Sequence, residues 1–307
     1  MIFHDDDCTR CGATEDLIRI SELGRALCPR CFPEFLRGRV EGTVRRFRMI
    51  PKRAHVAVAV SAGSDSACLL HILAATRARL NFRLSAIHIH MGIGEYSDVC
   101  HEIVREQCSR SRVSLEVERV DSHGVRIDPI AGWPVCAVCG AVRRALMPRV
   151  ALRIGANVLA TGHTLDDQLQ YMLRNVLSGR PVSPAPVLQP TGFAPLKVKP
   201  LVQVPDTASE EYVRLAGLPI AGEPCPRFVP DSHRFKDVFD LLEQRAPMGK
   251  MIFWQVLRKV MRPGDDEEDT CHDCPICGEP TTMHICPICR LREAQEHCDQ
   301  TEAESAG

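Results

Sequence analysis

Paired cysteines are the most abundant reactive groups of this 307-residue chain, which has 16 cysteines. Two sets of Cys-x2-Cys pairs stand near its two ends. Their members are Cys8, Cys11, Cys28 and Cys31 near the start, and Cys274, Cys277, Cys286 and Cys289 near the end. Two such pairs a short distance apart predict a tetrahedral zinc ion held by four thiolates. Cys271, three residues before Cys274, offers an alternative ligand for the second site.

A third group of cysteines is incomplete as a zinc site. Cys136-x2-Cys139 is followed by Gly140, and the next cysteine, Cys225, comes much later. Three thiolates suit an iron–sulfur cluster with one iron left open, an incomplete zinc site or a catalytic dithiol. The spacing alone leaves these three interpretations open.

A Ser/Gly segment has the composition of a phosphate-binding loop. The apolar run 56–60 predicts a buried strand, Ser61–Ser66 predicts a turn, and the apolar spacing then becomes helical. Free backbone N–H groups at such a helix start bind anions. No Gly-Lys-Ser/Thr follows, so this is not a Walker loop. If position 62 needs a left-handed backbone, Ala62 costs roughly 1–2 kcal/mol there.

These groups must be positioned by an alternation of strands and helices. We expect strands at 54–60, 84–91, 114–120 and 157–161, and helices near 65–79, 97–111, 139–154 and 165–178. Such alternation predicts a parallel sheet, whose ligands bind at the carboxyl ends of the strands. The loops after the first, second and fourth strands should then face one crevice. Asp166-Asp167 would lie there, either for magnesium and substrate or as a helix cap.

The remaining segments complete a four-part division of the chain. Residues 35–53 form a basic amphipathic stretch, either a solvated helix face or a phosphate-contacting surface. Residues 181–235 are Pro-rich and irregular, with a helical stretch around 208–216, and 236–262 predicts one or two amphipathic helices before an acidic hinge at 265–269. We divide the chain into a zinc module (1–34), a basic linker helix (35–53), an α/β domain (54–262) and a second zinc module with a tail (263–307).

Composition limits the setting of the protein. The formal net charge is −1, so any RNA-binding surface must be local. No signal-peptide pattern and no apolar run of membrane-spanning length is present, which predicts a cytoplasmic protein without a membrane partner. In that compartment cysteines indicate metal or thiol chemistry.

Taken in order, these features resemble the tRNA 2-thiouridine synthetases of the TtuA type, relatives of the cytosolic enzymes that thiolate the wobble uridine. The resemblance covers nearly the whole chain. It is carried by cysteine knuckles at both ends, the Ser61–Ser66 loop, Gly-Ile-Gly-Glu-Tyr-Ser at 92–97, Cys-x2-Cys-Gly, Thr-Gly-His-x-Leu-Asp-Asp at 161–167, Lys-Pro-Leu at 199–201 and a late Cys-Pro. The loop itself is similar to the pyrophosphate loop (PP-loop) of the ATP pyrophosphatases.

The resemblance implies a Rossmann-like α/β PP-loop domain flanked by the two zinc modules, and a tRNA sulfurtransferase. ATP, with Mg²⁺, would adenylate the C2 oxygen of a uridine, and sulfur would then displace AMP. A [4Fe-4S] cluster with one open iron would present the sulfur. A ubiquitin-like thiocarboxylated carrier and a homodimer are also implied.

Carried over by position, the resemblance implies a set of site residues. The ATP site would include Ala59, Ser61, Gly63, Asp65, Ser66, His88, Gly162 and Asp167, the cluster ligands would be Cys136, Cys139 and Cys225, and the catalytic residues would be Asp167, Arg143, Cys136 and Cys225. The chain departs from the family pattern at Ala62, Ser64, His90 and Arg143, where relatives carry Gly, Lys, Asp and Lys. Two alternatives follow from these departures: a cluster-bearing RNA-binding scaffold without adenylation, and a sulfur-removing enzyme that needs no ATP.

Overall fold

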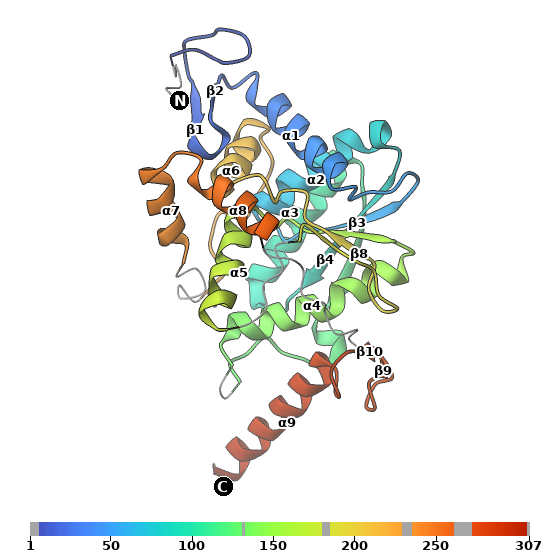
Figure 1. The fold of residues 1–307 in the computed structure, drawn as a ribbon. Coiled ribbons are helices and arrows are strands. Elements are labelled where there is room, and N and C mark those ends of the chain that lie inside the picture. The colour runs from blue at the N-terminus through green and yellow to red at the C-terminus, as the bar shows by residue number, and fades with distance from the viewer. Residues whose placement is uncertain (1–5, 131–132, 180–184, 229–234, 261–271, 306–307) are drawn as a thin grey trace.

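A six-stranded sheet lies at the centre of the protein, in the order β5-β4-β3-β6-β8-β7 (Figure 1). The computed structural model describes residues 6–130, 133–179, 185–228, 235–260 and 272–305. The strands are β3 (His55–Ala59), β4 (Arg83–His90), β5 (Ser114–Arg119), β6 (Val158–Ala160), β7 (Val187–Leu188) and β8 (Leu196–Val198). All neighbours pair in parallel except β7, which is antiparallel to β8. The predicted parallel α/β architecture is therefore confirmed.

Alternate residues of the strands supply two separate cores. Val56 and Val58 of β3 pack into the larger core, on the side of α2 (Ser64–Leu80) and α3 (Gly94–Ser111). Ala57, between them, belongs to the other core with α4 (Val135–Arg153). This division follows from the two-residue period of a strand. The helices α5 (Leu165–Leu177) and α6 (Asp206–Leu215) join the larger core.

Two expectations about secondary structure need correction. The helix predicted from 139 begins at Val135. Pro134 is its N-cap, and a proline can stand at a helix start because no hydrogen bond is lost there. Cys136 and Cys139 therefore lie within the first helical turns. The segment 181–235 is less irregular than expected, because β7, β8 and α6 fall within it; strands of two or three residues are too short to show a period.

The N-terminal segment packs directly onto the α/β unit. A hairpin of β1 (Ile18–Ile20) and β2 (Arg25–Leu27), joined by the turn η1 (Ser21–Leu23), leads into α1 (Phe32–Arg46). Phe32, Leu36 and Val40 of α1 are buried in the larger core. Part of the basic stretch is used internally, because Arg39 donates to the Gln203 carbonyl at 2.8 Å. Arg45 pairs with Glu41 on the same helix.

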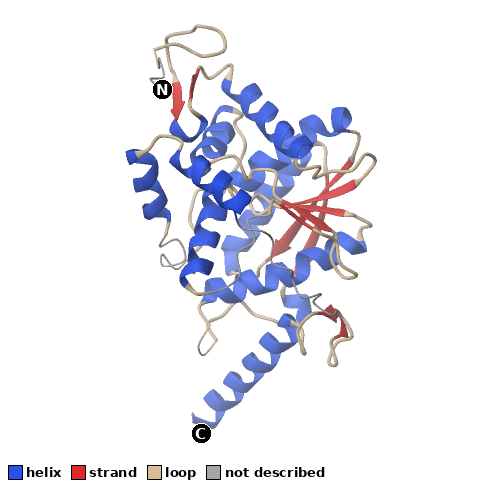
Figure 2. Ribbon diagram, in the orientation of Figure 1, coloured by secondary structure: helices blue, strands red, loops and turns tan. Residues whose placement is uncertain are grey.

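The C-terminal elements separate into two groups, one beside α5 and one below α4 (Figures 1 and 2). The predicted amphipathic region forms two helices, α7 (Lys236–Arg245) and α8 (Gly249–Val260), and a small hairpin, β9 (His272–Asp273) with β10 (Pro280–Thr281), precedes α9 (Pro287–Ser305). Another short helix, η2, spans Asp121–His123. The predicted acidic hinge and Cys271 lie outside the described residues. None of the helices described has the length and apolarity needed to cross a bilayer.

Candidate active site

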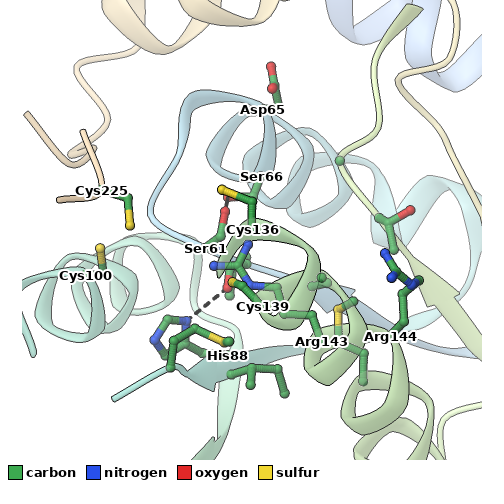
Figure 3. A pocket seen from close by; sticks show the side chains of 18 of the residues that line it. Ser61, Asp65, Ser66, His88, Cys100, Cys136, Cys139, Arg143, Arg144 and Cys225 are labelled. Carbon is green, nitrogen blue, oxygen red and sulfur yellow. Dashed lines mark hydrogen bonds between the residues drawn. The ribbon is translucent and has the colours of Figure 1, made fainter. Parts of the chain in front are cut away.

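A cavity of about 560 Å³ opens at the carboxyl ends of β3, β4 and β6 (Figure 3). The three loops expected to converge there all line it. The predicted site residues on its wall are Ala59, Ser61, Asp65, Ser66, His88, Cys136, Cys139, Arg143, Gly162, Asp167 and Cys225. Gly63 is not on the wall and forms the N-cap of α2 instead. Because β3 is the strand from which the sheet grows in both directions, the cavity lies at a topological switch point.

The Ser61–Ser66 loop is held by its own serines. Ser66 Oγ accepts the backbone N–H of Ser61 at 3.1 Å and donates to the Gly63 carbonyl at 3.1 Å. The N-cap Gly63 has no side chain, and no side-chain cap is found for α2 in the described residues. The first amides of this helix are therefore available to an anion.

Ala62 adopts the left-handed backbone conformation that was considered for position 62 from the sequence. Its φ is +66°, and it is fully buried. Its carbonyl accepts the N–H of Ala221 at 2.9 Å, so the loop is also tied to the segment that carries Cys225. The departure from glycine thus preserves the loop conformation at the cost of local strain.

Gly162 is required by the close approach of two loops. A Cβ at this position would lie 3.2 Å from the Asp65 carbonyl carbon and 3.2 Å from the Ser66 nitrogen. Both are backbone atoms, which cannot move aside as a flexible side chain does. Gly162 therefore allows the loop after β6 to rest against the start of α2.

The two adjacent aspartates have different environments. Asp167 lines the cavity and completes a capping box with Thr164, whose N–H donates to Asp167 Oδ2 at 3.1 Å. Asp166 is buried away from it, 2.7 Å from Lys250 Nζ and 2.9 Å from the Asp206 nitrogen. The helix-cap interpretation of the pair holds for Asp167, which also faces the site, and Asp166 is structural.

Three cysteines from two distant segments line the cavity. Cys136 and Cys139 are one helical turn apart on α4, so both project from the same face. Cys225 approaches from a separate loop (Figure 3). That loop is clamped by Arg227, whose Nη1 lies 2.6 Å from Asp128 Oδ1 in the segment before α4. Cys136 Sγ is 3.9 Å from the Arg227 carbonyl.

The cavity carries a positive charge on one wall. Arg143 follows Cys139 by one turn, and its charge opposes the burial that raises the pKa of the Cys139 thiol. Arg144 and Lys197 also line the cavity, and burial lowers the pKa of each. Such a wall favours an anionic ligand, and a thiolate near Arg143 is stabilised.

Two further titratable groups are strongly affected by burial. Desolvation raises the pKa of Asp65 from 3.8 to about 7, although a hydrogen bond from Ser209 opposes the change. His163 donates to or accepts from Thr161 Oγ1 at 2.8 Å. Burial and neighbouring Lys199, Lys197 and Arg144 lower the pKa of His163 to about 3, so its ring is neutral near pH 7.

Sequence reasoning missed several residues of the cavity wall. Arg144 and Lys197 line the cavity but were not among the predicted site residues, and the strand that carries Lys197 has only three residues. Cys100 on α3 was also absent from the predicted site. It lines the cavity, where burial raises the pKa of its thiol and the neighbouring Cys225 adds to the rise. The local signal for Lys197 is the apolar-polar-apolar order of Leu196, Lys197 and Val198, which is typical of a strand.

The two outer cysteine sets each form a compact four-sulfur site. The ligand atoms of each set lie within 4.8 Å of one another. Sγ atoms of Cys11 and Cys28 are 3.7 Å apart, as are those of Cys277 and Cys286. Four thiolates at about 2.3 Å from a tetrahedral ion are roughly 3.8 Å apart, so both sites fit a single metal ion. Among the described residues, Cys136, Cys139 and Cys225 do not form such a compact set. Wider separation of the thiols is what a group larger than a single metal ion requires.

The fold and loop define a PP-loop nucleotide-binding domain, and comparison with known proteins agrees. A family model described as the PP-loop domain matches residues 38–221. The tRNA-5-methyluridine(54) 2-sulfurtransferase of Thermus thermophilus is 31% identical over 94% of this chain and 91% of its own. The enzyme of the same name from Pyrococcus horikoshii is 30% identical over 87% of each chain.

A solved structure supports the same fold. The U34-tRNA thiolase NcsA of Methanococcus maripaludis, solved with its [4Fe-4S] cluster, superposes with a TM-score of 0.78 at 23% identity. The match covers 94% of this chain and 96% of that one. The chain therefore belongs to the PP-loop tRNA 2-thiolation sulfurtransferases.

Proposed function

We propose that the chain adenylates the C2 oxygen of a tRNA uridine with ATP and then replaces that oxygen with sulfur at the same cavity. The observation that carries the proposal is that three thiols and a phosphate-type loop line one cavity. Position 54 is the proposed substrate, because both sulfurtransferase relatives carry that position in their names.

The nucleotide half of the reaction would use the loop and the basic wall. The amides at the start of α2 hold the phosphates, and Arg143, Arg144 and Lys197 balance their charge. The uridine oxygen attacks the α-phosphate of ATP, and pyrophosphate leaves. Asp167 is the proposed partner of Mg²⁺ and the proposed catalytic carboxylate, because its side chain is on the wall beside this loop.

The sulfur half of the reaction would use the three thiols. Cys136, Cys139 and Cys225 are the proposed ligands of a [4Fe-4S] cluster, since three thiolates lining one cavity fit a cluster with one iron free. Such a cluster would supply a bound sulfur at its free iron. Arg143 is proposed to stabilise negative charge as sulfur adds at C2 and AMP departs with the oxygen. Since Arg remains protonated, it can hold charge there but cannot move a proton.

Zinc is the proposed ion of both outer sites, because all-thiolate tetrahedral sites favour it. We also propose a cytoplasmic setting. The 15 cysteines of the described residues form no disulfide, and a reducing compartment would keep them as thiols or metal ligands. A thiocarboxylated carrier and a homodimer stay predictions.

Turnover tests the proposal directly. Anaerobically purified, cluster-loaded protein is incubated with Mg·ATP, sulfide and tRNA transcripts, one of them changed to cytidine at position 54 and another at position 34. We expect AMP release and a 2-thiolated base from the transcript changed at position 34. We expect neither product from the transcript changed at position 54. Thiolation without AMP formation would contradict adenylation. Loss of product only with the position-34 variant would show that position 34, and not position 54, is the modified uridine.

The cluster ligands are tested apart from activity. Cys225→Ala should lower the iron content and visible absorption of the reconstituted protein, because one of three ligands is lost. Cys298→Ala, on α9 outside the cavity, is the matched control and should keep both. An unchanged spectrum in Cys225→Ala would remove Cys225 from the ligand set.

A further inference from the structure

Trp133 is an exposed aromatic residue near the reaction cavity. Of the two tryptophans in the sequence, Trp254 is fully buried, whereas Trp133 is 39% exposed. Tryptophan is strongly buried on average in folded proteins. Trp133 precedes Cys136 of the cavity wall by three residues, and three residues span at most roughly 11 Å. A large aromatic surface therefore lies within that distance of the cavity wall.

The C-terminal cysteine site supplies a cation to this tryptophan. Arg290, the residue after Cys289, has its guanidinium carbon 5.7 Å from the centre of the Trp133 ring. This separation permits a cation–π interaction, in which the positive charge is attracted to the face of the indole. Among the described residues, no carboxylate pairs with Arg290. An aromatic face and an unpaired guanidinium are therefore presented together.

A groove continues from Arg290 over the C-terminal cysteine site. Its volume is about 650 Å³, and it is lined by Met283, His284, Ile285, Arg290, Glu293 and Ala294. Ile285 and Ala294 pack against the same core as Val135 of the cavity wall. The groove and the cavity are thus built on one core, and Trp133 contacts the groove through Arg290.

We propose that Trp133 and Arg290 form a stacking platform for an unpaired nucleobase next to the uridine that enters the cavity. The proposal rests on the tRNA substrate proposed above and adds where a neighbouring nucleotide lies. A uridine can enter a cavity only after it leaves its stack, so its neighbours lose a stacking partner. Bases of single-stranded RNA stack on aromatic side chains and on Arg guanidinium planes, and both surfaces are present here.

The charges around the platform favour a nucleic acid as its partner. The cavity wall is positive through Arg143, Arg144 and Lys197, and Arg290 adds an unpaired positive charge at the platform. A polynucleotide whose uridine lies in the cavity therefore meets favourable charge at both places. The carboxylate of Glu293 is also in the groove, where it can accept a hydrogen bond from a base amino group.

Affinity for tRNA is the first test. Full-length protein loaded with its cluster and zinc is titrated with tRNA without ATP, so that turnover is not needed. Trp133→Ala should weaken binding by about 5-fold to 150-fold, the effect of losing one stacked base, and Trp133→Phe should retain most of the affinity. Arg290→Gln should weaken it by about 2-fold to 5-fold. The matched control is Phe253→Ala, since Phe253 on α8 is an aromatic residue with 40% exposure, and it should bind tRNA as the unchanged protein does.

Tryptophan fluorescence is the second test, because Trp133 is the exposed one of the two tryptophans. Binding of tRNA should quench the emission of the unchanged protein and protect it from acrylamide. In Trp133→Phe only the buried Trp254 emits, and tRNA should leave its emission unchanged. A blunt RNA duplex, whose bases are already stacked on one another, should not quench either protein.

The outcomes separate this inference from the proposed function. If tRNA binds while Trp133→Ala keeps full affinity and the fluorescence does not respond, the platform is overturned and Trp133 only anchors the C-terminal cysteine site. Equal quenching by the blunt duplex would assign the surface to the phosphate backbone and overturn base stacking. If the unchanged protein does not bind tRNA, the proposed function fails together with the platform. Zinc content and circular dichroism establish that each variant is folded.

Discussion

Ala62 carries backbone strain at the centre of the phosphate-type loop. Its φ of +66° costs roughly 1–2 kcal/mol for an L-residue. Replacing it by glycine removes that cost. The replacement also raises the conformational entropy of the unfolded chain, which lowers stability by about 0.4–1 kcal/mol, and it removes a buried methyl group worth about 0.8 kcal/mol.

We therefore predict that Ala62→Gly changes the free energy of unfolding by less than about 1 kcal/mol. Ala62→Val should lower it by roughly 2 kcal/mol or more, because a β-branched residue is more strained at positive φ and the site is full. Urea unfolding of the two variants checks this. Equal losses in both would show that backbone strain is not the deciding factor.

Asp65 should make stability depend on pH in an unusual direction. Its pKa is raised from 3.8 to about 7, so the folded state holds a proton that the unfolded state has lost. The free energy of unfolding therefore decreases as pH rises from about 4 to about 7. His163, whose pKa is lowered to about 3, acts in the opposite direction below its ordinary value of 6.5.

The variant Asp65→Asn isolates the carboxyl contribution. Relative to the unchanged protein, it should gain stability as pH rises through this range and show no further gain above about pH 7. Thermal unfolding without nucleotide and magnesium at several pH values measures the difference. A difference independent of pH would mean that Asp65 is ionised throughout.

Among the elements, α8 is fastened by a buried ion group. Lys250 Nζ lies 2.7 Å from Asp166 of α5, 2.6 Å from Asp240 of α7 and 3.2 Å from Glu22 of η1. Its side chain is 5% exposed. One ammonium therefore compensates carboxylates from three elements, and it holds the start of α5 beneath the cavity.

Lys250→Met should destabilise the fold by about 3–5 kcal/mol, because Asp166 and Glu22 would remain buried without their cation. Lys236→Met, which breaks a half-exposed bridge to Asp206, should cost about 0–1 kcal/mol. Equilibrium unfolding of both variants makes the comparison. A small effect of Lys250→Met would indicate that the carboxylates take up protons and that the group adds little stability.

At the scale of the whole molecule, the outer cysteine sites are built into the two cores. Cys8 and Cys28 belong to the larger core, and Cys274, Cys286 and Cys289 belong to the other core with α4. The C-terminal helix α9 packs against α4, which carries Cys136 and Cys139. A change at the C-terminal site should therefore reach the reaction cavity.

Cys286→Ser should remove about one zinc ion per chain and make α9 sensitive to protease, because a tetrahedral site has lost a ligand. It should also lower the iron bound after reconstitution, since α4 loses packing. Cys298→Ser on α9 is the control and should retain zinc, iron and protease resistance. Retention of full iron by Cys286→Ser would show that the module and the cavity are independent.

Much of this arrangement was readable from residue order. The alternation of apolar runs gave β3, β4, β5 and β6, and the convergence of the loops after β3, β4 and β6 followed from parallel topology. The outer cysteine sites followed from spacing, because ligands close in sequence need little help from the fold. The start of α4 and the strand β8 were missed, since a proline N-cap and three residues give too weak a local signal.

The sequence by itself determined the α/β class, the loop chemistry and the family, because these depend on periodicity and on short ordered motifs. Only the tertiary structure decided that Cys225 lines the same cavity as Cys136 and Cys139, that Asp166 and Asp167 separate, and that Lys197 joins the cavity. The physical reason is that such contacts join segments far apart in the chain, and packing of the two cores sets their geometry.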